Sequence, residues 1–183
     1  MNGSKEFENE IALISDKDKQ DFVRYYFDNN YVPKYFWEIG ASSTGKYHPK
    51  FAQGDGGLVR HTKAVVMFAQ ELLRMSSYAF MKDEYKDLAI IACLCHDTCK
   101  YGESEFDKDR YSIHGELASQ NVAQAWYDYF GTECPYLLTN AILTHMGQWS
   151  TERPFTQIDR LVHLSDYVAS RNFIDIPSLA PTT

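Results

Sequence analysis

The chain has 183 residues, a length typical of one domain, and its 44% hydrophobic and 23% charged residues are an ordinary globular balance. Its 25 acidic against 18 basic residues give a net charge of −7, which argues against a broad surface that tracks the phosphates of long duplex nucleic acid. No apolar run reaches the roughly 18 residues of a membrane span, and residues 1–10 lack the apolar segment of a secretory signal. The crowded cysteines of Cys93–Cys99 are a poor disulfide framework. We therefore expect a single cytoplasmic domain over residues 1–183 that does not bind a membrane.

Helical periodicity of the apolar residues predicts an all-α fold, a compact helical bundle. Glycines and a proline mark expected helix ends, and strand-like alternation is scarce. In chain order, the predicted helices cover Asp16–Phe27, Leu58–Met75, Asp87–Lys100, His114–Gly131, Pro135–Gly147 and Gln157–Arg171. We expect irregular stretches at 40–57 and 101–113, and a loose tail from about residue 174 to residue 183.

Histidines recur on the inward faces of these helices. His61, His96, His114 and His145 each lie on, or at the start of, the apolar stripe of a separate helix, and Asp97 directly follows His96. Taken alone, a buried histidine is more often a hydrogen-bonded core residue than a metal ligand. An adjacent His-Asp pair in so apolar a run is costly to bury unless a cation compensates its charge. Together with a second inward carboxylate, Asp166, the pattern predicts a metal centre.

The same residues carry a resemblance to a known family. Gly56-Gly57-Leu-Val-Arg-His61-Thr, His96-Asp97-Thr-Cys-Lys100, His114, His145 and Asp166 resemble the HD-domain superfamily of metal-dependent phosphohydrolases over about residues 35–171. The stretch 41–48 is similar to the segment preceding Gly-Gly in the HD domain of bacterial 3′–5′ exoribonucleases. The family often has an aliphatic residue and Gly after His-Asp, where this chain has Thr98 and Cys99.

The resemblance implies a compact helical bundle of the HD type with two divalent metal ions, of Mn, Fe, Ni, Co, Zn or Mg. It implies a first metal held by His61, His96, Asp97 and Asp166, and a second held by His114 and His145 with Asp97 bridging the two. The implied activity is hydrolysis of a phosphomonoester or phosphodiester bond by metal-activated water. A small phosphorylated substrate is expected, a nucleotide, a cyclic nucleotide or a short oligonucleotide.

Other residues near this motif have two interpretations each. Lys100, four residues after His96, either neutralises phosphoryl charge beside the catalytic Asp97 or is a cation favoured at a helix end. His48 either contacts the substrate or protonates its leaving group, or is an exposed loop residue without function. Arg171 either clamps a phosphate or is solvated.

Outside the ligand set, His163 lies one turn before Asp166, where it orients that carboxylate or merely packs in the bundle. Tyr101, Tyr111 and Trp149 either stack on a base or belong to the core.

Several motifs are set aside, and several functions stay open. The P-loop-like run 40–46 lacks the hydroxyl residue after Lys46. The cysteines are interpreted as buried thiols rather than zinc ligands, and the acidic stretch 103–109 as a solvated loop. The same metal ligands would also suit an HD-type di-iron oxygenase, or a catalytically silent module that binds metal or nucleotide. A homodimer is possible.

Overall fold

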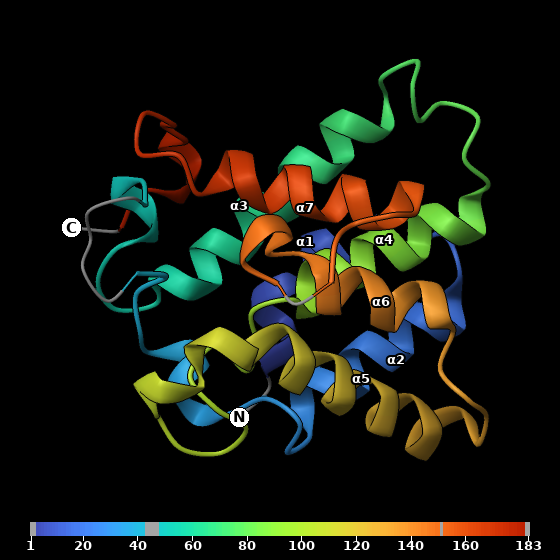
Figure 1. The fold of residues 1–183 in the computed structure, drawn as a ribbon, viewed down its shortest axis with the longest axis horizontal. Coiled ribbons are helices and arrows are strands. Elements are labelled where there is room, and N and C mark those ends of the chain that lie inside the picture. The colour runs from blue at the N-terminus through green and yellow to red at the C-terminus, as the bar shows by residue number, and fades with distance from the viewer. Residues whose placement is uncertain (1–2, 43–47, 151, 182–183) are drawn as a thin grey trace.

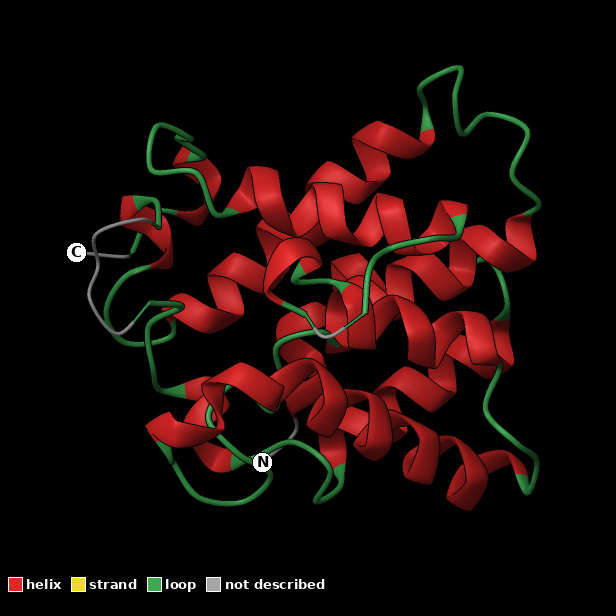
Figure 2. Cartoon of the chain, viewed as in Figure 1, coloured by secondary structure: helices red, strands yellow, loops and turns green. Residues whose placement is uncertain are grey.

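A computed structural model describes residues 3–42, 48–150 and 152–181 of the chain. Over these residues it contains helices and no strand, as Figure 2 shows, so the all-α prediction is confirmed. The α-helices are α1 (Glu8–Ile11), α2 (Lys17–Asp28), α3 (Gly57–Leu73), α4 (Asp83–Cys95), α5 (His114–Phe130), α6 (Tyr136–Thr144) and α7 (Gln157–Ala169). The short 3₁₀ helices are η1 (Gly3–Phe7), η2 (Lys34–Trp37), η3 (Lys50–Ala52), η4 (Lys108–Ile113), η5 (Gly147–Trp149) and η6 (Pro177–Leu179).

Helix α4 lies at the centre of the bundle. It packs against α3, α6 and α7, while α5 covers the far side of α6 (Figure 1). Every residue from Asp87 to Cys95 is buried, which explains why this segment is apolar on all sides rather than along one stripe. The C-terminal end of α4 therefore delivers the residues that follow it into the protein interior.

Capping side chains and one glycine explain where three of the helices begin or end. Asp16 precedes α2 and accepts hydrogen bonds from the backbone N–H groups of Asp18 and Lys19. Thr156 and Asp159 form a reciprocal capping box at the start of α7. Gly131 ends α5 with φ +69°, a left-handed conformation that favours glycine.

The end of α4 differs from the sequence prediction. The α-helix stops at Cys95, and residues 96–100 form tight turns instead of continuing it. The backbone N–H of Thr98 donates to the carbonyl of Cys95, three residues back, and the Thr98 hydroxyl donates to the same carbonyl at 2.9 Å. Such three-residue spacing tightens the chain at a helix end, which apolar periodicity does not reveal.

The N-terminal elements η1 and α1 were not predicted, although Phe7 and Ile11 are completely buried. At the other end, Ile176 is also buried, so the expected tail includes a residue anchored in the core. Residues 182–183 of that tail, and residues 43–46 of the P-loop-like run, lie outside the described residues. Within the described ranges, no helix is both long and apolar enough to cross a membrane.

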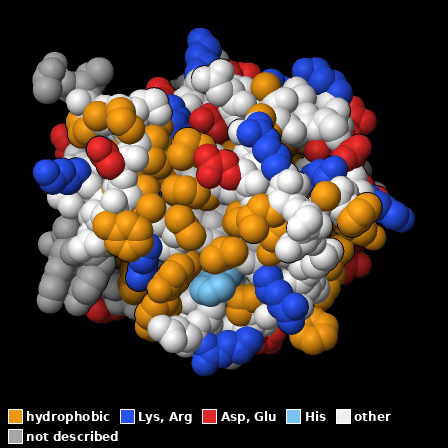
Figure 3. All heavy atoms as spheres, turned by 90° about the horizontal axis from the view of Figure 1, so that it is seen from above, with side chains coloured by type: hydrophobic (Ala, Val, Ile, Leu, Met, Phe, Trp, Pro, Cys, Tyr) orange, Lys and Arg blue, Asp and Glu red, His pale blue; other side chains and the backbone are white. Residues whose placement is uncertain are grey.

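One face of the molecule is rich in exposed hydrophobic side chains. Seen from the upper side of Figure 1, they gather across the middle of the surface, with a histidine among them and basic residues nearer the margin (Figure 3). Among the described residues, the most exposed large apolar side chains are Phe80, Phe155 and Phe173. Because exposed apolar patches are common sites of association, the homodimer stays a prediction for this protein.

Candidate metal centre

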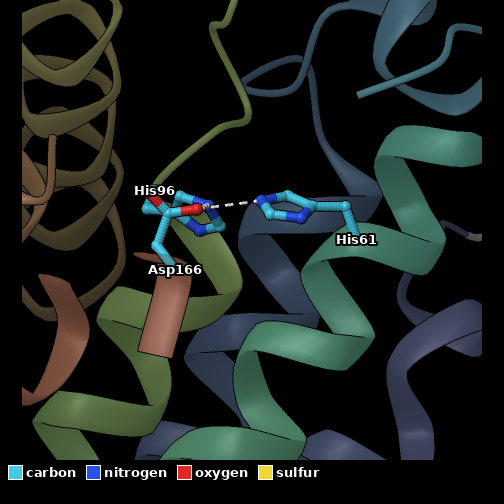
Figure 4. A group of neighbouring side chains, drawn as sticks. All are labelled: His61, His96 and Asp166. Carbon is cyan, nitrogen blue, oxygen red and sulfur yellow. Dashed lines mark hydrogen bonds and ion pairs between the residues drawn. The ribbon is translucent and has the colours of Figure 1, made fainter. Parts of the chain in front are cut away.

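Three of the predicted ligands converge from three helices (Figure 4). His61 projects from the N-terminal part of α3, His96 follows the last residue of α4, and Asp166 lies on α7. His61 Nε2 is 3.1 Å from Asp166 Oδ1, and His96 Nε2 is 3.8 Å from the same oxygen. Both histidines are completely buried, whereas the Asp166 side chain keeps 18% of its surface exposed. The cluster therefore approaches solvent at Asp166.

Asp97 lies between two groups of histidines and faces each group with a different oxygen. Its Oδ2 is 3.6 Å from His61 Nε2 and 3.5 Å from His96 Nε2. Its Oδ1 is 3.0 Å from His114 Nε2 and 3.6 Å from His145 Nε2. A single carboxylate thus joins the two groups.

The second group is formed by His114, at the start of α5, and His145, directly after α6. Their Nε2 atoms are only 2.9 Å apart, and both residues are almost completely buried. Two imidazole lone pairs at this separation repel each other unless a proton or another cation lies between them. A cation bound between the two nitrogens would remove this repulsion.

Three histidines of the cluster share one orienting device. His96, His114 and His145 each directly follow the last residue of a helix, and the backbone N–H groups of His114 and His145 donate to the carbonyls of Tyr111 and Ile142. The Nδ1 of each bonds the carbonyl three residues earlier, at 2.6–2.8 Å, on Cys93, Tyr111 or Ile142. Because Nδ1 must carry the proton to donate this bond, Nε2 is left to point its lone pair into the cluster.

His61 is different because it lies within a helix. Its buried Nδ1 bonds no backbone carbonyl and has no hydrogen-bond partner among the described residues. In the same part of the chain, the buried Nε2 of His96 also lacks a hydrogen-bond partner. A buried polar nitrogen without a partner is costly, and a cation within the cluster would satisfy the nitrogen of His96.

Lys100 balances the charge of Asp97. Its Nζ is 2.5 Å from Asp97 Oδ2, and both side chains are buried. Burial by itself raises the pKa of Asp97, but the charge of Lys100 and the contacts with His114 and His145 outweigh it and hold that pKa well below its ordinary value. Burial likewise lowers the pKa of Lys100, yet the Asp97 carboxylate raises it overall, so both groups are ionised at neutral pH.

Burial also keeps two histidines neutral. It lowers the pKa of His96 from 6.5 to about 4, so this imidazole is free to act as a ligand near pH 7. His48 packs its ring 5.4 Å from that of His61, and burial lowers its pKa to about 3. A neutral His48 near the ligands suits hydrogen bonding to a substrate better than protonating a leaving group.

The donor set fits divalent cations. Imidazole nitrogens and carboxylate oxygens bind such ions at about 2.0–2.2 Å, which places neighbouring ligand atoms roughly 3.0–3.5 Å apart. The Nε2 and carboxylate separations across the cluster, 3.0–3.8 Å, lie close to that spacing. Two overlapping groups have ligand atoms within 4.8 Å of one another, His61–His96–Asp166 and His96–Asp97–His145. No cysteine belongs to either group among the described residues, and burial raises the pKa of the Cys93 thiol, as expected for an inert core residue.

Residues 58–171 match the family model of the HD domain. The match covers most of the chain and includes Lys100 and all the predicted metal ligands, but not His48. The chain belongs to the HD domain family. Members of this family are generally metal-dependent phosphohydrolases, in keeping with the clustered imidazoles and carboxylates. No curated protein and no solved structure matches the chain significantly.

Within the HD domain, His163 does not contact Asp166 as expected. Its Nδ1 bonds the backbone carbonyl of His145 at 2.7 Å, and the Asp166 carboxylate instead accepts a bond from the Ser170 hydroxyl at 3.2 Å. Gly147, with φ +59°, brings its backbone so close to the His163 ring that an added Cβ would lie 2.3 Å from a ring carbon. His163 therefore supports the backbone of His145 rather than Asp166.

Arg171 also lies apart from the cluster. Its guanidinium stacks 4.2 Å from the centre of the Tyr167 ring, and its Nε donates to the Tyr167 carbonyl. No ion pair joins Arg171 to Asp166 in the described parts of the chain. The phosphate clamp considered from the sequence gains no support from this geometry.

Of the three aromatic residues considered for base stacking, Tyr101 and Tyr111 lie near His114, whereas Trp149 lies at the surface. Tyr111 packs its ring 5.1 Å from that of His114, and Tyr101 lies 6.0 Å beyond Tyr111. Trp149 is 62% exposed on η5.

The acidic stretch 103–109 is exposed throughout, as expected of a solvated loop.

Sequence reasoning missed two supporting residues, Ser170 and Tyr35. Ser170 lies one turn after Asp166, a spacing that helix periodicity makes readable once Asp166 is placed. The Tyr35 hydroxyl donates to the Gly102 carbonyl and accepts from the Tyr101 N–H, so it anchors the chain that leaves the cluster. That contact joins residues 66 and 67 positions apart, and no local pattern announces it.

Proposed function

We propose that this protein hydrolyses a phosphomonoester or phosphodiester bond of a nucleotide, a cyclic nucleotide or a short oligonucleotide, with two divalent cations as cofactors. One observation carries the proposal: the Asp97 carboxylate lies between two histidine groups and offers one oxygen to each. A site for a single cation has no use for such a shared carboxylate or for the second histidine pair.

The residues that would hold the cations divide along Asp97. His61, His96 and Asp166 supply nitrogen and oxygen donors on the Oδ2 side. His114 and His145 supply nitrogen donors on the Oδ1 side. Metals bound in such a site lower the pKa of a coordinated water and polarise phosphoryl oxygens.

The remaining work falls to side chains of the chain itself. Lys100 brings a buried positive charge 2.5 Å from Asp97 and 5.9 Å from the centre of the Tyr111 ring, where an anionic phosphoryl group is stabilised. His48 lies above His61 with a neutral ring, and we assign it to hydrogen bonding with the substrate. Arg171 has no assigned role.

The substrate is small in this proposal. A net charge of −7 disfavours long polyanions, because they need an extended basic surface that neutralises many phosphates. The similarity of residues 41–48 to the exoribonuclease branch favours a nucleotide-like substrate. Aromatic side chains next to His114 supply faces on which a base can stack.

The test is anaerobic incubation of the Mn²⁺-loaded protein with a pool of nucleotides, cyclic nucleotides and short oligonucleotides, with products identified by mass spectrometry. Asp97→Ala serves as the inactive control, and Asp175→Ala, which removes an exposed carboxylate, as the matched active one. Cleavage by the wild type and Asp175→Ala, but not by Asp97→Ala, is the expected result.

Cleavage of nothing by the wild type would contradict the proposal. Oxygen uptake by the iron-loaded protein would then identify the di-iron oxygenase. Absence of both activities, combined with a loss of thermal stability when the metal is removed, would identify the silent binding module.

A further inference from the structure

A small cavity is separated by the Tyr111 ring from the metal-ligand cluster. The cluster is the set of predicted ligands His61, His96, Asp97, His114, His145 and Asp166. The cavity measures about 210 Å³ and is lined by Ile39, Gly40, Ser42, Tyr101, Phe106 and Lys108. Whole drug-sized ligands occupy pockets of about 300–1,000 Å³, so this cavity has room for a single ring system rather than for an entire nucleotide. No predicted metal ligand lines it.

A continuous row of rings connects the cluster to the cavity. His114 is followed by Tyr111 at 5.1 Å, Tyr101 at a further 6.0 Å and Phe106 at a further 4.7 Å between ring centres. The Tyr35 hydroxyl fixes the middle of this row through bonds to the backbone of Tyr101 and Gly102. The buried Tyr101 ring therefore holds Phe106, which is 47% exposed, in place at the cavity, and this lowers the entropic cost of ordering a ligand against it.

Charge gives a ligand on this row a direction. At the cluster end, the Lys100 ammonium is within 5.9 Å of the Tyr111 ring centre. At the cavity end, the exposed loop 103–109 carries four acidic residues and one lysine, Lys108. Of the described residues, Lys108 and no acidic residue line the cavity itself, so the acidic side chains surround it rather than enter it. The buried charge of Lys100 favours phosphate at the first end, and the apolar and aromatic lining favours an uncharged ring at the second.

We propose that the cavity between Tyr101 and Phe106 is a binding subsite for a nucleobase. Because Tyr111 lies between the cavity and the ligands, the base bound there belongs to the nucleotide next to the one whose phosphate is at the cluster. Phe106 stacks on this base, and Lys108 donates a hydrogen bond to an acceptor on its edge, since ammonium groups only donate. This inference rests on the proposed function and selects substrates with two or more bases.

The test compares a dinucleotide with two analogues in which one or the other base is replaced by hydrogen. For the wild type and Phe106→Ala, kcat and KM are measured with all three substrates. Loss of a base–aromatic stack is expected to raise KM for the full dinucleotide by about 5- to 150-fold without changing kcat. The same substitution leaves KM unchanged for the analogue that lacks the base bound in the cavity, because the interaction is already absent.

Matched controls separate this subsite from a general surface effect. Phe155→Ala removes another exposed phenyl group, just before α7, and should leave KM unchanged. Lys108→Ala should raise KM for the full dinucleotide, whereas Lys82→Ala, at the opposite end of α4 from His96, should not. An equal effect of Phe106→Ala on all three substrates, or none on any, overturns the subsite while the hydrolase stands.

If the wild type cleaves none of the three substrates, the hydrolase fails for them and binding decides on the subsite. Saturation-transfer NMR with the uncleaved dinucleotide then compares the wild type with Phe106→Ala. Contact of one base with the wild type alone supports the subsite as a binding site. Equal contact, or none, overturns it.

Discussion

The two halves of the metal-ligand cluster are built in different ways. The half with His61, His96 and Asp166 draws its ligands from three packed helices, and its atoms stand 3.1–3.8 Å apart. The half with His114 and His145 lies at two helix ends, and its nitrogens have approached to 2.9 Å. Both histidines of the second half bond a backbone carbonyl through Nδ1, as His96 does in the first half. His61 has no such partner among the described residues, and its Nε2 instead lies 3.1 Å from Asp166 Oδ1.

The difference shows two ways to position a ligand. Burial in α3 and the contact with Asp166 fix where the His61 ring lies. A backbone carbonyl three residues earlier fixes both the ring and its proton, so His114 and His145 present Nε2 before any cation arrives. Both histidines of the second half are oriented in this way, but only His96 in the first half is.

The largest expected effect comes from the first half. His61→Ala removes a ligand that bridges α3 to Asp166 and Asp97, and we expect turnover to fall by at least about 1,000-fold. Steady-state hydrolysis measures this, with circular dichroism to verify the fold. A variant with more than a tenth of wild-type turnover would show that the first half is not catalytic.

Metal content tests the second half. His114→Ala should leave one metal per chain where the wild type binds two, because the remaining His145 and one Asp97 oxygen are too few donors to retain an ion. Inductively coupled plasma mass spectrometry of dialysed protein gives both values. Equal metal content in the two proteins would remove the dinuclear assignment.

A smaller effect is expected at Lys100, which contacts Asp97 but is no metal ligand. Lys100→Met keeps the volume of the side chain and removes its charge, and we expect kcat to fall about 10- to 100-fold with metal content unchanged. A matching loss of metal would assign Lys100 to ligand positioning instead of phosphoryl stabilisation.

The smallest effect concerns how the free energy of unfolding depends on pH after a chelator has removed any bound metal. His96 has a pKa lowered by burial from 6.5 to about 4, so the unfolded chain takes up its proton first as the pH falls. The stability contributed by neutral His96 is full above pH 6.5 and is lost as the pH falls towards 4. Urea denaturation should show that the free energy of unfolding declines less steeply over that pH range for His96→Gln than for the wild type. Parallel pH profiles of the two proteins would refute this prediction.

The sequence revealed most of the fold and the members of the cluster, but not how they are oriented. Periodicity located α2, α3, α5 and α7 because each buries one apolar stripe along its length. It extended α4 to Lys100, because apolar residues and tight turns after Cys95 look alike in one dimension. The motif brought His61, His96 and Asp166 together, but the carbonyl partners of the histidines depend on where helices stop.

Long-range support was beyond sequence reasoning for a physical reason. His163 had two interpretations, orienting Asp166 one turn away on the same helix or packing in the bundle, and it contacts the backbone of His145. The side-chain spacing within α7 permits both arrangements. The absence of a side chain at Gly147, far away in the sequence, leaves room for the ring to approach the backbone of His145.

The divided carboxylate of Asp97 has a consequence for how the two halves respond to each other. Its oxygens belong to one rigid group, so a cation that draws one oxygen towards it reorients the other. Binding in one half must therefore alter affinity in the other half, and thermodynamic linkage makes that influence equal in both directions. The first and second metal ions are thus expected to bind cooperatively or anticooperatively, with His61 and His114 reporting on the same equilibrium from opposite sides.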